Sequence, residues 1–369
     1  MIKVLQIGMT DNLGGIEKFI YTFTTNIHNK KILFDFISMS KGEIIYSEIL
    51  QKIGKIINVE NEFRHPVKCY NQIKKIMIEN KYDVIHINKN SVSSLVVLFA
   101  AKKAGIKIRI LHSHNTKSNG GIIINILHRL NKFFAIKLCN KFIACSEEAA
   151  RWMFTKNVIN KHEYIIINNA IDISKFRYSE EIRNKKRNEL HIKPCDYVIG
   201  NVGRFVKQKN HKFLIDIFYN YYQKNKNAKL VLVGVGPLMN DIKKKVSEYK
   251  IEKSVVFLNN RQDVNELYQA FDLFILPSIY EGLGIVLIEA QTSGLPCLAS
   301  SSLPKNSKVT NLIKYISLNK DVEEWVNECG TINEERDNYD NFKKIEDSGY
   351  NIKKEIEKLE SIYLEKVKS

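Results

Sequence analysis

Two glutamates eight positions apart, Glu281 and Glu289, flank a glycine turn and have the clearest chemical potential in this sequence. The preceding run, Asp272–Pro277, is short, apolar and closed by proline, which predicts a buried strand. A turn then covers 281–284, and helical spacing follows from Ile285 to Ser293. The first turn of that helix has free backbone N–H groups and a partial positive charge, which suit a phosphate or a sugar hydroxyl.

A pair of carboxylates beside a glycine turn can also serve as the acid and base of a hydrolase. If every residue from Glu281 to Glu289 were helical, the two would lie about 12 Å apart along the helix axis. A glycosidase pair is separated by roughly 5–9.5 Å. We therefore expect the two glutamates to bind different parts of one extended ligand. Taken alone, they could equally be two solvated glutamates on a surface helix.

A basic loop follows the predicted strand Tyr197–Val202. It begins with Gly203 and Arg204, and Lys209 lies five residues after the arginine. A guanidinium and an ammonium group in one loop suit a diphosphate, the first as a two-point clamp and the second as a point charge. The alternative is an ordinary basic surface loop, which is common in a chain of net charge +17.

Further glycines and an arginine lie in loops after other predicted strands. Gly234 and Gly236 close the strand Lys229–Gly234 and would let a ligand approach the backbone. Arg261 follows another strand, where a nucleotide base could rest against the loop. Gly15 opens the first helix and forms a second possible nest for an anion. No G-x-G-x-x-G follows either opening strand, so these glycines are not a dinucleotide fingerprint.

His112 and His114 end a predicted strand in the first half of the chain. Paired histidines either bind a metal or pack, and no carboxylate or thiol stands near them at ligand spacing. The six cysteines have no C-x2-C spacing, which favours reduced thiols in the cytosol. We therefore expect no metal site.

Strand and helix patterns alternate along the chain, which predicts parallel sheets covered on both faces. The series starts at Lys3–Gly8, breaks at a charged stretch, and restarts at Tyr197–Val202. We expect the domain linker near this stretch, at Tyr178–Lys193. We expect an α/β protein with two Rossmann-like, doubly wound domains, residues 1–185 and 186–345, that face a central cleft. The tail 346–369 predicts an amphipathic helix that packs back on the N-terminal domain. Such domains bind ligands at the carboxyl ends of their strands, where the residues above lie.

The positive charge is concentrated in the first half. Residues 1–200 hold 32 Lys and Arg against 17 Asp and Glu, whereas residues 201–369 hold 25 against 23. This asymmetry indicates that one domain meets an anionic surface, either a membrane or nucleic acid. Gly121–Lys141 interleaves apolar and basic side chains, for which docking on anionic lipid and an ordinary helix with one core face are about equally good explanations. The longest charge-free apolar segment, Val92–Ala101, is too short to span a bilayer.

Together these segments resemble glycosyltransferase family 4, retaining enzymes of the GT-B fold, over essentially the whole chain. Within that family the chain is similar to bacterial exopolysaccharide and capsular polysaccharide glycosyltransferases. The resemblance is carried by GGIEKF (14–19), DVIHIN (83–88), HSHNT (112–116), NNAID (168–172), GRFVKQKN (203–210), VGVGP (233–237), NNRQDV (259–264) and PSIYEGLGIVLIEAQTSGLP (277–296).

The resemblance implies a role for each matching residue. Arg204 and Lys209 would bind the diphosphate of the donor. Glu289 would bind the ribose, and Glu281 would hold the transferred sugar. His114 would line the reaction centre. The expected catalytic residues are therefore Arg204, Lys209, Glu281 and His114. The expected donor-binding residues are Gly15, Gly203, Gly234, Gly236, Arg261, Gly282, Leu283, Gly284, Ile285 and Glu289.

The resemblance also implies a retaining hexosyltransferase without a metal or other cofactor. A nucleotide-diphosphate sugar, with UDP favoured, would donate a hexose or N-acetylhexosamine to a lipid-linked or oligosaccharide acceptor in surface polysaccharide synthesis. The enzyme would be cytoplasmic and peripheral on the inner face of the cell membrane. A nucleotide-sugar 2-epimerase of similar fold is the alternative. A basic nucleic-acid-binding protein is less favoured, because the chemical residues gather at strand ends rather than along one groove.

Overall fold

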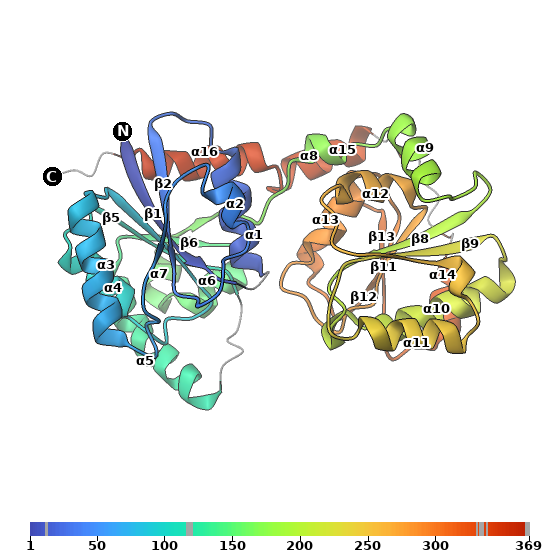
Figure 1. Cartoon of the computed structure of the whole chain (residues 1–369), viewed down its shortest axis with the longest axis horizontal. Helices are drawn as coiled ribbons and strands as arrows, with labels where there is room; N and C mark the ends of the chain where they lie inside the picture. The colour runs from blue at the N-terminus through green and yellow to red at the C-terminus, as the bar shows by residue number, and fades with distance from the viewer. Residues whose placement is uncertain (12–13, 116–120, 330, 332–335, 337–338, 366–369) are drawn as a thin grey trace. The chain divides into compact units, whose positions relative to one another are not determined.

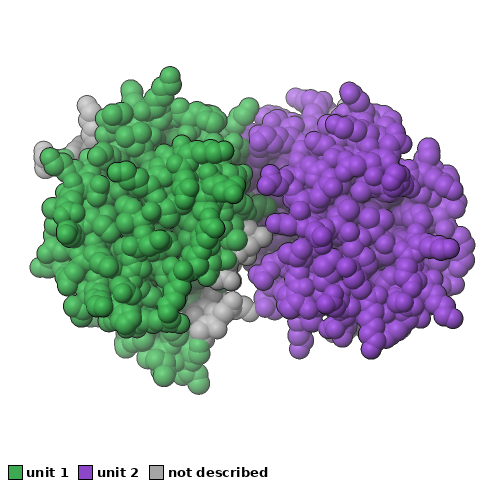
Figure 2. All heavy atoms as spheres, in the orientation of Figure 1, with its two compact units in different colours: residues 1–169, 352–369 green, residues 170–351 purple. Residues whose placement is uncertain are grey.

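The computed structural model describes residues 1–369 except 12–13, 116–120, 330, 332–335, 337–338 and 366–369. The chain divides into two compact units, coloured separately in Figure 2: unit 1 is residues 1–169 with 352–369, and unit 2 is residues 170–351. Each unit contains a parallel β-sheet with helices on both faces (Figure 1), which confirms the predicted α/β class.

The sheet of unit 1 has the strand order β3-β2-β1-β4-β5-β6-β7 in the described residues. Its strands are β1 (Ile2–Met9), β2 (Ile32–Ser38), β3 (Ile56–Asn58), β4 (Val84–Lys89), β5 (Ile108–Ser113), β6 (Lys141–Ala144) and β7 (Ile165–Ile166). Its helices are α1 (Gly15–Asn26), α2 (Ser47–Leu50), α3 (Pro66–Asn80), α4 (Val96–Lys103), α5 (Ile122–Leu138), α6 (Glu147–Met153), α7 (Lys156–Asn160) and α16 (Ile352–Tyr363).

Alternate side chains of the central strands of unit 1 enter two different environments, as the pleat requires. Leu5 and Ile85 belong to an apolar core that includes residues of α3, α4 and α5. Their neighbours Gln6 and His86 point to the opposite face, where both contact Tyr363 of α16. One face of this sheet is therefore apolar, and the other contains buried polar groups.

The sheet of unit 2 has the order β10-β9-β8-β11-β12-β13 in the described residues. Its strands are β8 (Tyr197–Val202), β9 (Ala228–Val233), β10 (Val255–Leu258), β11 (Leu273–Leu276), β12 (Cys297–Ser300) and β13 (Ile313–Ile316). Its helices are α8 (Ile173–Phe176), α9 (Glu180–Glu189), η1 (Lys207–Lys209), α10 (His211–Lys224), α11 (Met239–Glu248), η2 (Glu252–Ser254), α12 (Val264–Ala270), α13 (Ile285–Thr292), η3 (Lys305–Ser307), α14 (Val322–Glu328) and α15 (Tyr339–Asp347).

Both faces of the unit 2 sheet are apolar, which is typical of a buried parallel sheet. Ile199 and Ile275 pack with residues of α10, α11 and α14. Val198 and Phe274, one position away, pack with residues of α12 and α13. Figure 1 shows these two groups of helices on opposite sides of the sheet.

The division of the chain differs from the expected boundary at residue 185, because α9 belongs to unit 2. Arg183 and Arg187 of α9 both form ion pairs with Asp272, which precedes β11. The Ser179 hydroxyl caps the helix by accepting a hydrogen bond from the Ile182 N–H. The charged stretch is therefore a packed helix and not a linker. At the other end, α16 belongs to unit 1.

Candidate functional site

Unit 2 has its topological switch point between β8 and β11, which are neighbours in the sheet although two strands and their helices lie between them in sequence. The parallel register pairs Leu273 with Ile199 and Phe274 with Gly200. In a doubly wound sheet, the loops that leave such neighbouring strands part in opposite directions and leave a crevice. The loop 203–210 follows β8 and the loop 277–284 follows β11, so the two predicted motifs meet here.

A lysine and a glutamate from these two loops are in direct contact. Lys209 Nζ lies 2.6 Å from Glu281 Oε1, and the two side chains are only 15% and 9% exposed. Gln208 connects the two loops through two hydrogen bonds. Its side-chain Nε2 donates to the backbone oxygen of Tyr280 at 2.9 Å, and its backbone oxygen accepts from the Ile279 N–H at 2.8 Å. The structure therefore brings together two predicted catalytic residues that are 72 positions apart.

Arg204 lies in the same loop as Lys209, but its side chain is exposed. Among the described residues no ion pair or hydrogen bond of its guanidinium is recorded. The guanidinium is thus available to an anionic ligand, whereas the ammonium group of Lys209 is already paired with Glu281.

Glu289 lies on α13 and is 5% exposed. The Tyr268 hydroxyl donates to Glu289 Oε2 at 2.9 Å. Burial, with the adjacent Glu289 carboxylate, raises the pKa of Tyr268 well above its ordinary value, so the phenol keeps its proton as a donor. Tyr268 thus orients Glu289. Sequence reasoning missed Tyr268, because it looks like one more aromatic residue on an amphipathic helix.

The turn before α13 depends on glycine at two positions for different reasons. Gly284 is the N-cap of α13 and has a φ of +73°, a left-handed conformation that favours glycine. At Gly282 a Cβ atom would meet no atom within 4 Å in the part of the chain that the structure describes. Leu283 and Ile285 pack against an apolar cluster that contains Ile288 of α13. The turn is therefore anchored by its apolar side chains, and it leaves space beside Gly282.

The remaining predicted donor-binding residues of unit 2 have structural roles in the described chain. A Cβ atom on Gly234 would lie 2.3 Å from Gly203 O, so these two loop ends are in close backbone contact. Gly236 is similarly close to the backbone of Phe205. Arg261 donates to both carboxylate oxygens of Asp263. The Arg261 hydrogen bonds hold the pKa of Asp263 below its usual range. Contact of Arg261 with a base stays a prediction.

In unit 1, Gly15 begins α1 at the carboxyl end of β1, and a Cβ atom there would also meet no atom of the described residues within 4 Å. Glu17, two residues later, is buried and accepts a 2.5 Å hydrogen bond from Thr10 Oγ1. The Gly15 backbone is therefore open to a ligand. It lies beside the unit 1 switch point between β1 and β4.

His114 follows β5, and its Nε2 lies 2.9 Å from Asn88 Oδ1 of β4. Burial lowers the pKa of His114 to about 3 and that of His86 to about 3, and it lowers the pKa of His112 as well. These histidines are neutral at physiological pH. Within the described part of the chain, no group of three or more His, Cys, Asp or Glu side chains is arranged to hold a metal ion.

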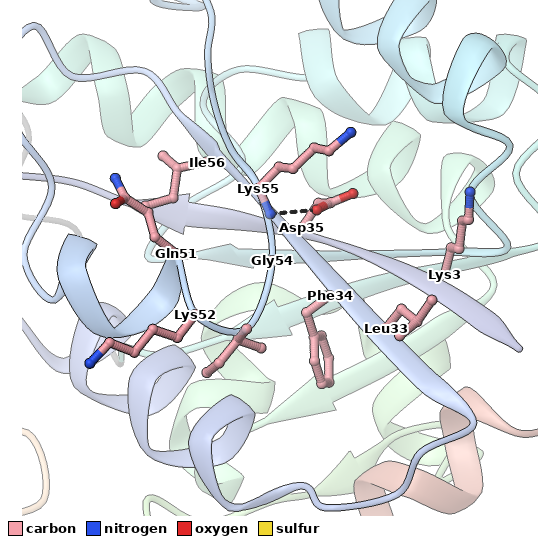
Figure 3. A pocket seen from close by; sticks show the side chains of 10 residues that line it. Lys3, Leu33, Phe34, Asp35, Gln51, Lys52, Gly54, Lys55 and Ile56 are labelled. Atoms are coloured by element: carbon pink, nitrogen blue, oxygen red, sulfur yellow. Dashed lines mark hydrogen bonds between the residues drawn. The ribbon is translucent and has the colours of Figure 1, made fainter.

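A hollow of about 580 Å³ lies elsewhere in unit 1 (Figure 3). Its lining includes Lys3 and Leu33, near the amino ends of β1 and β2 and thus away from the carboxyl ends where the switch point lies. Asp35 in its wall already accepts hydrogen bonds from Lys55 N–H and the Tyr82 hydroxyl, each at 2.6 Å. The carboxylate of Asp35 is therefore already hydrogen-bonded within unit 1.

Two family descriptions match the sequence and together span most of it. Residues 13–175 match Glycosyltransferase Family 4, and residues 182–347 match Glycosyl transferases group 1. The chain therefore belongs to glycosyltransferase family 4, with a group 1 glycosyltransferase domain as its second part. The predicted resemblance to glycosyltransferase family 4 is thus confirmed, and the loops described above are those of a glycosyltransferase.

Similar curated proteins come from several bacteria. The putative glycosyltransferase EpsF of Bacillus subtilis (strain 168) is 29% identical over 333 residues, which cover 88% of this chain and 85% of EpsF. The Escherichia coli UDP-Gal:alpha-D-GlcNAc-diphosphoundecaprenol alpha-1,3-galactosyltransferase is 23% identical over 383 residues, 99% of this chain and 97% of that protein.

Solved structures share the fold over the whole chain. Anabaena Alr3699/HepE in complex with UDP aligns with a TM-score of 0.73 and 16% identity, over 98% of this chain and 99% of HepE. A glycosyltransferase from Rickettsia africae ESF-5 aligns with a TM-score of 0.76 and 16% identity, over 98% and 97%. The predicted GT-B fold is confirmed. Among the described residues, no helix is both long and apolar enough to cross a membrane.

Proposed function

We propose that this glycosyltransferase moves a hexose or N-acetylhexosamine, with retention, from a UDP-sugar to a lipid-linked or glycan acceptor in surface polysaccharide synthesis. The observation that carries the proposal is the Lys209–Glu281 contact at the switch point of unit 2. Anabaena Alr3699/HepE, which has the same fold, has been solved in complex with UDP and with UDP-glucose. The E. coli relative is named for a UDP-galactose donor and a diphosphoundecaprenol acceptor.

The chemistry places the largest demand on the leaving diphosphate, where negative charge develops as the bond to the anomeric carbon breaks. Arg204 and Lys209 meet that charge, together with the free N–H groups at the start of α13. Glu281 binds hydroxyls of the sugar, and Glu289 binds the ribose. The acceptor hydroxyl attacks from the leaving-group face, and a diphosphate oxygen takes its proton. No step requires a metal ion.

When the donor binds, the Lys209 ammonium group moves partly away from the Glu281 carboxylate. In the described structure each neutralises the other inside a largely buried loop pair. A diphosphate competes for the ammonium group, and the freed carboxylate accepts hydrogen bonds from the sugar. The ion pair thus holds both side chains in position before the donor arrives, which reduces the ordering that binding would otherwise require.

The function is tested by a screen of UDP-sugars in a transfer assay with a diphospholipid-linked sugar acceptor. Lys209→Ala and Glu281→Ala are each expected to lower kcat/KM at least about 100-fold, with an unchanged circular dichroism spectrum. Lys207→Ala is the matched control, because Lys207 is exposed on the same loop. Equal activity of wild type and the Lys209 variant would refute the site. EDTA is expected to leave the rate unchanged.

We also propose that the basic unit 1 docks on an anionic membrane through α5, on the inner face of the cell membrane. Large apolar side chains of α5 are 40–80% exposed: Ile122, Ile123, Ile126, Leu127, Leu130, Phe133 and Phe134. Arg129 and Lys132 lie on the same helix, and the net charge of the chain is +17. An exposed apolar face with basic residues on one helix suits insertion into an anionic lipid interface.

Co-sedimentation with vesicles of mixed neutral and anionic lipids tests this surface. The paired substitutions Leu130→Gln and Phe133→Gln are expected to weaken binding about tenfold or more, since each buried apolar side chain contributes about 1.5–3 kcal/mol. Phe63→Gln is the control, because Phe63 is equally exposed in unit 1 but lies outside α5. Absence of wild-type binding at low salt would refute membrane docking.

A further inference from the structure

A continuous set of polar side chains, all buried except the part-buried His114, connects α16 to the carboxyl end of β5 in unit 1. Its members are Gln6, His86, Asn88, His112, His114 and Tyr363. They come from β1, β4, β5 and α16, and from the residue that follows β5. A buried polar group costs free energy unless it is hydrogen-bonded, so the direction of each hydrogen bond is constrained.

The two amides define where the chain of hydrogen bonds starts. Asn88 Nδ2 donates to Gln6 Oε1 at 3.1 Å and to the backbone oxygen of Ile7 at 3.0 Å. Gln6 therefore presents its Nε2 to Tyr363, whose hydroxyl accepts at 2.9 Å. The backbone oxygen of Ile7 can only accept, so it fixes the orientation of Asn88 and, through Asn88, that of Gln6.

One branch leads from Tyr363 to His112. Because the Tyr363 oxygen accepts from Gln6, its own proton is free for His86 Nδ1, which lies 2.6 Å away. His86 then carries its proton on Nε2 and donates to His112 Nδ1 at 3.0 Å. His112 is consequently protonated on Nε2, since a neutral imidazole has one donor and one acceptor nitrogen.

The other branch leads from Asn88 to His114. With both Nδ2 hydrogens used, Asn88 offers Oδ1 as an acceptor, and His114 Nε2 donates to it at 2.9 Å. His114 therefore has its lone pair on Nδ1. The burial that lowers the pKa values of His86, His112 and His114 keeps all three rings neutral. Whether each ring nitrogen donates or accepts a hydrogen bond therefore depends on the tautomer and not on the charge of the ring.

The two branches end at neighbouring histidine rings, one with a hydrogen-bond donor and the other with an acceptor. The rings of His112 and His114 have centroids 4.0 Å apart. His112 Nε2, a donor, and His114 Nδ1, an acceptor, have no hydrogen-bond partner among the described residues. Phe19 of α1 packs edge-on against both rings and limits their rotation. Both nitrogens are covered by protein in this structure, so a substrate hydroxyl reaches them only after a covering side chain moves, and it then meets one donor and one acceptor.

We propose that Tyr363 is a positioning residue for sugar transfer: its hydroxyl fixes His112 with the proton on Nε2, so that His112 and His114 present one donor and one acceptor. This role rests on the proposed function and on the prediction from the family resemblance that His114 lines the reaction centre. The C-terminal helix thereby acts on the site through a single hydroxyl group, in addition to covering one face of the sheet.

Tyr363→Phe tests the tautomers directly, because it removes the hydroxyl and keeps the aromatic ring. Protein labelled with ¹⁵N in its histidine rings distinguishes protonated from unprotonated ring nitrogens by NMR, with signals assigned from single His→Gln variants. In wild type, His86, His112 and His114 are expected as protonated on Nε2. In the variant, His86 and His112 lose this single state, whereas His114 keeps it because Ile7 O still holds Asn88. An unchanged His112 spectrum would overturn the proposal.

Steady-state kinetics test the consequence for transfer. Tyr363→Phe is expected to lower kcat about tenfold, the effect of one misplaced hydrogen bond, with little change in the dissociation constant for UDP. Leu359→Ala is the control, because Leu359 is buried on the same helix and its removal loosens α16 while keeping the hydroxyl. A normal kcat in Tyr363→Phe, or an equal loss in Leu359→Ala with intact tautomers, would overturn the positioning role. If wild type transfers no sugar, the proposed function fails, while the spectra still decide the tautomers.

Discussion

At Gly15 and Gly282 of the candidate site, an added methyl group would meet no other atom of the described chain within 4 Å. We expect Gly15→Ala and Gly282→Ala to change the free energy of unfolding by less than about 0.5 kcal/mol, yet to raise KM for the donor about tenfold. The physical reason is that only a bound ligand supplies atoms close to these positions. Urea unfolding and donor-dependent kinetics measure the two effects.

Gly284→Ala is the control for these substitutions, because Gly284 has a φ of +73°. Alanine there is expected to cost about 1–2 kcal/mol of stability, whatever its effect on transfer. An unchanged KM in both Gly15→Ala and Gly282→Ala would show that no ligand approaches either backbone position.

How much of the site sequence reasoning can reach depends on the signal that each residue carries. The Lys209–Glu281 contact follows from the rule that loops after neighbouring parallel strands lie at one edge. Tyr268 and Tyr363 were missed, since a tyrosine in a helix has the same apolar periodicity whether or not its hydroxyl meets a buried polar group. Such partners are set by tertiary packing, which one sequence does not display.

At the scale of elements, two arginines of α9 share one carboxylate of unit 2, while Lys186 of the same helix pairs with Asp263 and Glu266. Asp272 accepts hydrogen bonds from Arg183 Nη2 at 2.5 Å, Arg187 Nη1 at 3.2 Å and the Val198 N–H at 2.7 Å. We expect Asp272→Ala to lower the free energy of unfolding by about 3–5 kcal/mol, because two largely buried guanidinium groups lose their counter-charge. Urea titration followed by circular dichroism measures the change.

An exposed ion pair in the same unit provides the comparison. Lys320 and Glu324 lie 3.0 Å apart with about half of each side chain exposed. Solvent screening makes such pairs weak, so Glu324→Ala is expected to cost less than about 1 kcal/mol. Similar losses in the Asp272 and Glu324 variants would mean that α9 is held by its apolar contacts instead.

Strands with conspicuous apolar runs were predictable, including the four-residue β11, and strands without such runs were not. The strands β1, β4 and β8 have apolar runs that stand out, whereas β12 and β13 are only four residues each and lie among loops. The sequence of α9 predicts a linker, because the segment is rich in charged residues. Ser179 followed by two glutamates is, however, a recognisable N-cap signature for that helix.

At the scale of the whole molecule, buried neutral histidines occur in both units and affect stability in the same direction. Burial lowers the pKa of His86 and His114 to about 3, and it lowers that of His211 in unit 2 to about 4. In the unfolded chain each takes up a proton below about pH 6.5. The unfolded state then binds more protons than the folded state, so stability falls as the pH drops from about 6.5 towards these folded pKa values.

His211 allows this dependence to be tested at one site. Its ring stacks on Phe205 with centroids 4.3 Å apart, and neither ring nitrogen has a partner among the described residues. His211→Phe therefore keeps an aromatic ring and removes a titrating group without removing a hydrogen bond. Between about pH 4 and 6.5, the variant should lose stability less steeply than wild type, by up to about 1.4 kcal/mol per pH unit. Urea unfolding across this range measures both slopes. Parallel slopes would mean that His211 takes up its proton as readily in the folded protein as in the unfolded chain.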